Sequence, residues 1–497
     1  MIFKNFLKVF HLIIILVLTT SLNKKNNYMK LKMCLTITMI IVFKRGFSQQ
    51  NWLNIQTGTE FSVALKSDKS LWAWGSNLNG QLGLGSLTFT VLPQKIGLIN
   101  DWTNIAAGSF HCLAIKEDSS LWAWGLNNNG QLGTGNTISY NVPQLINNQK
   151  KWIKIEAGQT HSIALAADST MYVWGDNNYG QLGLGNTISK YFPVQLSDSI
   201  KFMAIGVGGA HTLGIQTNGS LWGWGANFNG QIGDGSTLEH LSPVQIGTAN
   251  DWKEIDAGFE FSLGIKNNQS IWSWGFNGNG QLGIGNTNQQ ITPNQIGDSL
   301  NWVKIEAGST FGFAINTFGN LYSWGANSFG QLGHGNEQLL TIPTKIGNDN
   351  DWVNISCAKG TIYNNAIFGY HAIGLKNEVE TLCAVGLNNA GQLGSGNQIT
   401  NSIFNCTIFL GQDELVLNEY FELYPNPNNG EFYFNLPEKY LGESIKIIIY
   451  NSFSKLISEI NSSINDKNQL KLELSPGVYF VEIQLENKIF NRKIIVQ

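Results

Sequence analysis

The chain has 497 residues, a formal net charge of −3 and a charged fraction of only 13%, against about 25% in an average soluble domain. Its 55 glycines favour many tight turns between short strands, because glycine readily adopts the positive φ angles of turns. The near-neutral charge without a basic stripe argues against nucleic-acid binding, and five scattered cysteines exclude a disulfide-based scaffold.

Residues 1–50 are predicted to be a signal-peptide region. Two apolar stretches, Val9–Leu18 and Met33–Phe43, each follow lysines, and each is shorter than the roughly 20 residues that cross a bilayer. A basic segment before a short apolar one is typical of a secretory signal. Because two occur in tandem, the true start is either the first residue or Met29. A two-helix membrane anchor fits poorly, since both stretches are short.

Residues 51–411 consist of seven repeats of about 50 residues. The segment Asn-Gly-Gln-Leu-Gly begins at Asn79 and recurs with small changes every 50 residues, and its seventh copy begins at Ala390 after 61 residues. A tryptophan column keeps the same period: Trp52, Trp102, Trp152, Trp252, Trp302 and Trp352. Periods of this length indicate a repeat architecture.

Each repeat is predicted to be β-structure. In Leu71-Trp-Ala-Trp-Gly75 both sets of alternating residues are apolar, which predicts a strand covered on both faces. Fifty residues suit the four short strands of one propeller blade, and seven blades lie within the about 4–8 typical of propellers. The sequence therefore predicts an all-β, seven-bladed propeller. Closure of the ring would pair strands from residues 51–75 with strands from residues 380–411.

The repeat resembles the regulator of chromosome condensation repeat. The resemblance rests on Ala-Gly-x-x-His-x-x-Ala-Ile, Leu-Trp-x-Trp-Gly, Asn-Gly-Gln-Leu-Gly-x-Gly and Pro-x-x-Ile, over about 360 residues. It implies a seven-bladed propeller. The named role of that family is nucleotide exchange on a small GTPase. Its eukaryotic members act in the nucleus, and an exported protein would not meet that GTPase.

The sequence predicts no catalytic residue, cofactor site or metal site. His111, His161 and His211 share one repeat column, but Phe61 and Phe261 occupy the same column, which favours packing or hydrogen bonding over metal ligation. The recurring glycine-rich string lacks the lysine of a phosphate-binding loop. No recurring pair of carboxylates and no nucleophile elbow is apparent, so we expect a protein that is not an enzyme.

The seventh repeat carries about 11 extra residues between Lys359 and Tyr370. Insertions in repeat proteins map to loops, and loops often carry function. Three residues are predicted to contact a partner at the propeller rim: Lys359, Tyr363 and Tyr370. A neutral insertion, or a closing blade that has drifted, is the alternative.

Three cysteines lie in the seventh repeat, and one pair of them is a candidate disulfide after export: Cys357, Cys383 and Cys406. Cys383 stands in a core tryptophan column, so simple burial is the alternative for this residue.

Residues 412–422 are a predicted linker, and residues 423–497 a predicted small β-sandwich of alternating strands. These last residues resemble the C-terminal sorting domain of type IX secretion. The resemblance rests on Tyr424, Pro425, Asn426, Pro427 and Gly430, then Gly477 and Tyr479, and finally Lys493. It implies export by a Gram-negative bacterium, removal of this domain, and attachment to the surface or release. An ordinary adhesive sandwich is the alternative.

Together these features predict a monomeric protein that is secreted or displayed on the outer membrane. Its propeller loops would bind a protein or a glycan, and its C-terminal domain would engage the type IX machinery. No nucleic-acid partner is expected. The alternatives are a secreted propeller enzyme of the glycoside hydrolase or lyase type and, by family label only, a nucleotide-exchange regulator.

Overall fold

The computed structural model describes residues 52–406 apart from short gaps at 147–149, 198–199, 364–365 and 378–380. Towards the C-terminus it describes residues 422–424, 431–435, 444–451, 456–463, 468–471, 474–485 and 488–496. The predicted signal region and nearly all of the predicted linker lie outside these ranges. Within them the chain forms strands and no helix, so no described segment qualifies as a membrane-spanning helix.

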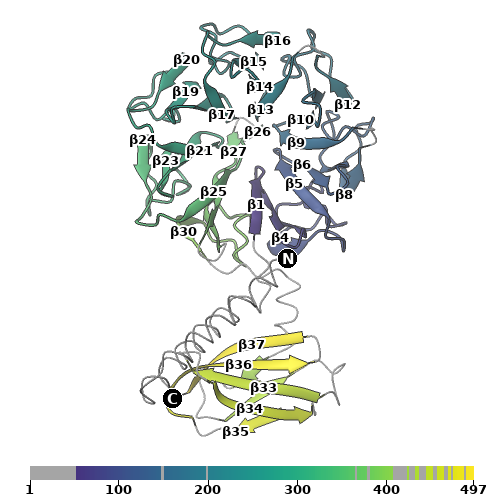
Figure 1. Cartoon of the computed structure of the whole chain (residues 1–497), viewed down its shortest axis with the longest axis vertical. Helices are drawn as coiled ribbons and strands as arrows, with labels where there is room; N and C mark the ends of the chain where they lie inside the picture. The colour runs from purple at the N-terminus through teal and green to yellow at the C-terminus, as the bar shows by residue number, and fades with distance from the viewer. Residues whose placement is uncertain are drawn as a thin grey trace, which may run out of the picture. The chain divides into compact units, whose positions relative to one another are not determined.

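Seven four-stranded antiparallel sheets form the blades of a propeller (Figure 1). The strands of blades 1 to 3 are β1 (Trp52–Thr57), β2 (Phe61–Lys66), β3 (Leu71–Gly75), β4 (Thr90–Lys95), β5 (Trp102–Ala107), β6 (His111–Lys116), β7 (Leu121–Gly125), β8 (Tyr140–Leu145), β9 (Trp152–Ala157), β10 (His161–Ala166), β11 (Met171–Gly175) and β12 (Lys190–Gln195).

Blades 4 to 7 follow the same order, except that a two-stranded hairpin is inserted in blade 7 between its first and second strands. The strands are β13 (Phe202–Val207), β14 (His211–Gln216), β15 (Leu221–Gly225), β16 (His240–Gln245), β17 (Trp252–Ala257), β18 (Phe261–Lys266), β19 (Ile271–Gly275), β20 (Gln290–Gln295), β21 (Trp302–Ala307), β22 (Phe311–Asn316), β23 (Leu321–Gly325), β24 (Leu340–Lys345), β25 (Trp352–Cys357), the hairpin strands β26 (Thr361–Tyr363) and β27 (Ala366–Phe368), β28 (His371–Lys376), β29 (Thr381–Gly386) and β30 (Asn401–Asn405).

The recurring Asn-Gly-Gln-Leu-Gly segment fastens each blade to the next. In blade 1, Asn77 Oδ1 accepts a hydrogen bond from the Leu82 amide at 3.0 Å and so folds the turn. The carbonyl of Gln81 then accepts the indole N–H of Trp124 in blade 2 at 2.9 Å. Gly83 has a φ of +69°, and a Cβ atom there would lie 2.8 Å from that indole nitrogen. This position therefore needs glycine both for its backbone angle and for close packing.

Blades 1 and 7 close the ring by packing their sheet faces together. Trp52 and Trp74 of blade 1 share one buried core with Ile373 and Leu375 of blade 7, and the Trp74 indole donates to the Gln392 carbonyl at 2.9 Å. The predicted seven-bladed closed propeller is confirmed. The predicted strand pairing between the two ends is wrong, because each end already supplies all four strands of its own sheet.

Each of the other blades places a tryptophan at its seam with the preceding blade, but blade 7 lacks this residue, and Phe404 takes its place at the seam between blades 6 and 7. Val385 stands in that tryptophan column. A Cβ atom on Gly333 of blade 6 would meet the Phe404 ring at 2.9 Å, whereas its counterpart Gly83 faces Trp124. The adjacent Cys406 forms a disulfide with Cys383, which identifies the bonded pair among the three candidates. Cys357 is buried and free.

The C-terminal residues form two further antiparallel sheets, with strand orders β31-β32-β35 and β34-β33-β36-β37. Their strands are β31 (Glu422–Tyr424), β32 (Glu431–Asn435), β33 (Ser444–Asn451), β34 (Leu456–Ser463), β35 (Asn468–Lys471), β36 (Gly477–Leu485) and β37 (Lys488–Val496). The Tyr479 hydroxyl donates to the Ser475 carbonyl at 2.8 Å, and Tyr479 is buried. It therefore fixes the turn that leads into β36.

Candidate functional site

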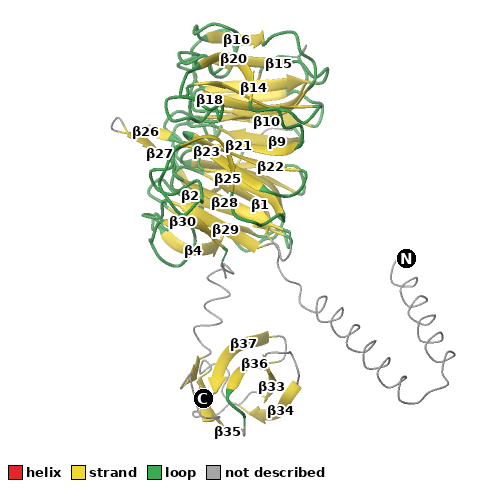
Figure 2. Cartoon of the chain, turned by 90° about the vertical axis from the view of Figure 1, so that its left-hand side faces the viewer, coloured by secondary structure: helices red, strands yellow, loops and turns green. Residues whose placement is uncertain are grey.

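The loops after the first and third strands of each blade form one face of the propeller, here called the loop face. In blade 1 these loops are residues 58–60 and 76–89, and the Ser76 amide donates to the Glu60 carbonyl at 2.9 Å to hold them together. The Leu126 amide and the Phe110 carbonyl repeat this bond in blade 2. The blade 7 insertion lies in such a loop, and its hairpin projects from this face (Figure 2).

The base of the insertion is hydrogen-bonded to three other blades. Thr59 of blade 1 donates to the Lys359 carbonyl at 3.2 Å, and Ser109 of blade 2 donates to the Gly360 carbonyl at 3.3 Å. From the other side of the ring, Ser309 of blade 6 donates to the Gly369 carbonyl at 2.7 Å. The insertion therefore lies across the propeller axis and covers this end of the central channel.

Lys359 is the only lysine or arginine in the sequence of the loop-face segments. Its side chain enters the channel. Its ammonium donates to the Val207 carbonyl of blade 4 at 3.1 Å and to Asp256 Oδ1 of blade 5 at 3.3 Å. Burial favours the neutral amine, but the carboxylates of Asp256, Glu156 and Glu306 outweigh it and raise the pKa of Lys359 above its usual range. Lys359 thus serves as the shared counterion of carboxylates from blades 3, 5 and 6.

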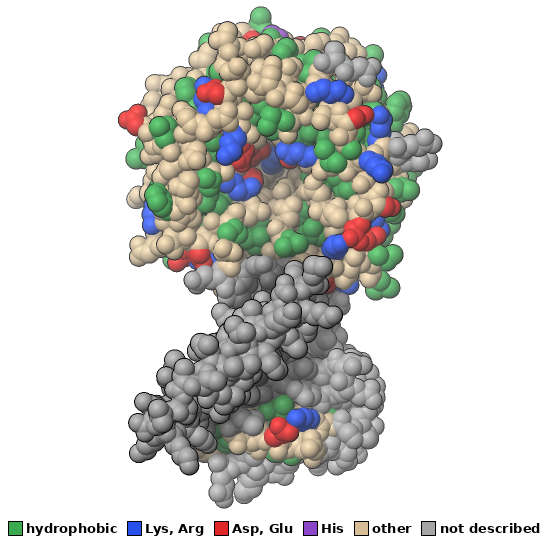
Figure 3. All heavy atoms as spheres, viewed as in Figure 1, with side chains coloured by type: hydrophobic (Ala, Val, Ile, Leu, Met, Phe, Trp, Pro, Cys, Tyr) green, Lys and Arg blue, Asp and Glu red, His purple; other side chains and the backbone are tan. Residues whose placement is uncertain are grey.

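Further ion pairs line the channel walls. Lys154 pairs with Glu156 at 3.8 Å, and Lys304 pairs with Glu306 at 3.5 Å. Burial raises the pKa of Glu306 to about 8, although Lys304 opposes this effect. Figure 3, which views the face opposite the insertion, shows charged side chains of both signs gathered in the central hollow. Glu156, Asp256 and Glu306 each lie within ion-pair distance of a lysine, and within the described ranges no group of residues could hold a metal ion.

Histidines and hydroxyl groups form a second set of contacts between blades. Each histidine Nε2 lies within hydrogen-bond distance of a hydroxyl on the next blade: His111 with Ser162 at 2.8 Å, His161 with Thr212 at 3.1 Å, His211 with Ser262 at 3.0 Å and His371 with Ser62 at 3.1 Å. Ser162 donates its own proton to the Gln131 carbonyl, and the other three hydroxyls donate to equivalent carbonyls. The proton therefore resides on Nε2 of each neutral imidazole, which donates to the hydroxyl.

The next blade supplies a hydroxyl only where this column carries histidine, and not where it carries phenylalanine. Three blades carry phenylalanine in this column. The corresponding residue on the next blade is Cys112 for Phe61, Gly312 for Phe261 and Ala372 for Phe311, and none of these has a hydroxyl. Burial lowers the pKa of all four histidines to about 3. These histidines are therefore neutral hydrogen-bond donors in the seams between blades.

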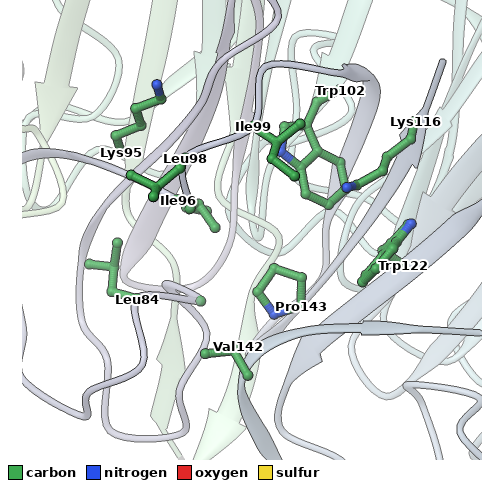
Figure 4. Close-up of a pocket in the computed structure, with 12 residues that line it drawn as sticks. Leu84, Lys95, Ile96, Leu98, Ile99, Trp102, Lys116, Trp122, Val142 and Pro143 are labelled. Atoms are coloured by element: carbon green, nitrogen blue, oxygen red, sulfur yellow. The ribbon is translucent and has the colours of Figure 1, made fainter.

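A groove of about 340 Å³ lies between the outer strands of blades 1 and 2 (Figure 4). Leu98 and Ile99 beside it are 93% and 64% exposed. The Lys116 ammonium lies 4.5 Å from the centre of the Trp122 ring and pairs with Asp101 at 3.2 Å. The groove is apolar with a fixed cation at its edge, and its lining includes no nucleophile or carboxylate.

The three residues predicted to contact a partner have different surroundings. Lys359 points into the channel rather than lying at the rim, and its side chain is 12% exposed. Tyr370 is half-buried and stacks on Phe329 of blade 6, with ring centres 4.7 Å apart. Tyr363 lies in β26, and its side chain is outside the described part. Of the predicted sorting residues, Tyr424 lies in β31, Gly477 and Tyr479 in β36 and Lys493 in β37, while Pro425, Asn426, Pro427 and Gly430 fall outside the description.

Sequence reasoning missed the channel carboxylates. Their signal is a recurring alternation in the first strand of three blades: Lys154-Ile-Glu156, Glu254-Ile-Asp256 and Lys304-Ile-Glu306. In a strand, residues two apart lie on one side, so each alternation places two charged groups on the same face of an otherwise apolar strand. Only the position of that strand at the axis reveals that these faces meet.

Family models match both parts of the chain. A model described as the RCC1-like domain matches residues 33–263, and two models of the regulator of chromosome condensation (RCC1) repeat match residues 268–315 with 319–361 and residues 252–281 with 302–331. A model described as the secretion system C-terminal sorting domain matches residues 422–497. The comparison with curated proteins finds no match.

Solved structures share the fold at low sequence identity. Human WBSCR16 has a TM-score of 0.60 and 20% identity, over 68% of this chain and 94% of its own. Yeast RCC1 (Prp20) bound to Kap60 has a TM-score of 0.60 and 18% identity, over 78% and 90%. Prp20p from Saccharomyces cerevisiae, studied together with its binding to Gsp1p and histones, has the same score and identity, over 80% and 95%. At these identities the likeness concerns the fold alone.

Proposed function

We propose that this chain, an RCC1-repeat propeller followed by a secretion sorting domain, is an exported monomeric protein that binds its partner through the loop face. The sorting domain indicates secretion or export to the cell surface through the type IX machinery. Display on the outer membrane of a Gram-negative bacterium is part of the proposal. The Cys383–Cys406 disulfide supports it, because disulfides persist in oxidising compartments outside the cytoplasm.

The capped axis is the observation that carries the proposal. Six blades join their first and second strands through short loops such as residues 58–60, whereas blade 7 adds the hairpin of β26 and β27. Hydrogen bonds from Thr59, Ser109 and Ser309 hold the base of this hairpin. A projecting element on a rigid base loses little conformational entropy when a partner binds, which favours a role in recognition.

Catalysis is the less favoured function. The channel carboxylates are the one described group that resembles a set of acid and base residues, but Asp256 is paired with Lys359, and Glu306 with Lys304. A glycoside hydrolase needs two carboxyl groups free to approach a scissile bond. Structures of the same fold include a protein crystallised with Kap60, which supports the use of this propeller as a binding scaffold.

The binding role can be tested with the fluorescently labelled full chain and whole bacterial cells as the probe. We expect saturable binding that is lost when residues 361–368 are deleted while Lys359, Gly360, Gly369 and Tyr370 are kept. Phe318→Ala serves as the control, because Phe318 lies in the loop between β22 and β23, at the other ends of the strands. Equal binding by the deletion variant would refute a role for the loop-face insertion.

The export role has a separate test. Deletion of residues 422–497 should leave the propeller in the periplasm, and fusion of the same residues to a periplasmic reporter should bring that reporter to the surface. Cell fractionation and surface protease digestion measure both outcomes. Undiminished surface display of the truncated chain would show that this domain is not the sorting signal.

A further inference from the structure

Aromatic residues occur on the loop face of blades 3 to 7. One residue from each of these blades contributes: Tyr179, Phe228, Phe276, Phe329 and Tyr370. Tyr179 is 41% exposed and Phe228 is 57% exposed, and their rings meet edge to face across blades 3 and 4 with centres 5.7 Å apart. Phe276, Phe329 and Tyr370 are only partly exposed. The two exposed rings, on the loops after the third strands of neighbouring blades, indicate an interaction surface.

Rigid turns carry the exposed rings. The Tyr179 amide donates to Gln181 Oε1 at 2.9 Å, and the Leu182 amide donates to Asn177 Oδ1 at 2.9 Å. The Phe228 turn repeats both bonds: the Asn229 amide donates to Gln231 Oε1 and the Ile232 amide to Asn227 Oδ1, each at 2.9 Å. The backbone beneath these two rings is therefore fixed before a ligand arrives, which lowers the entropic cost of stacking against them.

The charges of the loop face exclude an anionic ligand. Its loops carry six acidic residues in the sequence: Glu60, Asp176, Asp234, Glu239, Glu260 and Glu337. Their one lysine or arginine is Lys359, whose ammonium is already bound to Asp256 in the channel. Nucleic acids and sulfated or phosphorylated polymers require exposed cations, so this face does not suit them.

Amide side chains lie next to both exposed rings. Asn178 is exposed next to Tyr179, and Asn229 is partly exposed next to Phe228. Amide groups donate and accept hydrogen bonds without charge. A pyranose sugar matches this pattern, since its C–H face stacks on an aromatic ring while its hydroxyl groups pair with amides at the ring edge.

We propose that the loop face of blades 3 and 4 binds a neutral polysaccharide, with Tyr179 and Phe228 as the stacking platform. This inference rests on the proposed binding function of the loop face and specifies its ligand.

The test uses the full chain in affinity electrophoresis through gels that contain xylan, mannan, mixed-linkage β-glucan or hydroxyethylcellulose. We expect at least one of these polysaccharides to retard the protein. Tyr179→Ala with Phe228→Ala should weaken that binding about tenfold or more, equivalent to about 1.4 kcal/mol. Phe228→Trp should retain it, because the ring is preserved. Thermal unfolding verifies that each variant is folded.

Phe318→Ala is the matched control, because Phe318 is 67% exposed but lies at the other ends of the strands. Its binding should equal that of the unchanged chain. Absence of retardation by all four polysaccharides, or equal binding by the Tyr179→Ala, Phe228→Ala variant, would overturn the inference. Saturable, hairpin-dependent binding to cells without polysaccharide binding would refute the glycan ligand and leave the general binding function standing.

Discussion

The Nε2 atom of His371 in blade 7 lies 3.1 Å from the Ser62 hydroxyl of blade 1, so the last blade of the ring holds the first by the contact that three other seams repeat. The Ser62 hydroxyl donates a hydrogen bond to the Gln392 carbonyl at 2.8 Å. The imidazole therefore donates as a neutral group. A protonated imidazole in this buried seam would carry an unpaired charge, which makes propeller stability depend on pH.

Acidification should destabilise the propeller from about pH 6.5 downward. The four seam histidines have a pKa of about 3 in the folded protein against 6.5 when unfolded. The unfolded chain therefore binds more protons at every pH between these values, and stability falls as the pH falls. Each histidine contributes about 1.4 kcal/mol per pH unit. Urea unfolding at pH 7, 6 and 5 measures the slope.

His211→Phe should reduce that slope by one histidine's share, since phenylalanine already occupies this column at Phe61, Phe261 and Phe311. The share of the slope from the other three seam histidines should remain. An identical pH dependence in the variant would show that His211 does not titrate with unfolding.

The pairing of histidine with a hydroxyl predicts a compensating double substitution. Ser262→Ala leaves the His211 N–H buried without its acceptor and should cost about 1–3 kcal/mol. Adding His211→Phe recreates the combination found at Phe311 and Ala372 and should recover most of that loss. Urea unfolding of the two single variants and the double variant measures the coupling. Simple additivity of the single effects would contradict the pairing.

Loss of the channel lysine should weaken the whole ring. Lys359→Met leaves the Asp256 carboxylate in the channel without its ion-pair partner. Removing one partner of a buried ion pair typically costs about 3–5 kcal/mol. Lys253→Met is the control, because Lys253 is exposed, and surface changes usually stay within about 0.5 kcal/mol. Equal denaturation midpoints of the two variants would argue against the network.

The Cys383–Cys406 disulfide should stabilise blade 7. Its cysteines are 23 residues apart in sequence, and closing a loop of this length contributes about 3 kcal/mol in the chain-entropy model. Cys383→Ala with Cys406→Ala should therefore lower the denaturation midpoint, and protein made in a reducing cytoplasm should show the same decrease. Cys112→Ala is the control for loss of a buried thiol. Thiol counting by mass spectrometry confirms the bond.

The sequence by itself determined the number and kind of the blades. Strand Leu71–Gly75 and the turn at Asn77 are held by hydrogen bonds within their own blade, so their signals lie close together in the chain and recur every 50 residues. Locally consistent patterns of this kind predict a repeat fold without knowledge of distant contacts. The sorting domain was recognisable for a similar reason, because its marks are short motifs.

Only the tertiary structure decided how the blades meet. Lys359 and Asp256 are 103 residues apart, and nothing in the sequence near either one indicates the other, because their contact depends on the curvature of the ring. The same holds for Phe404, which fills a tryptophan site from a different strand, and for closure by packed sheet faces. Side chains that converge on an axis are brought together by the geometry of all seven sheets, which no single repeat contains.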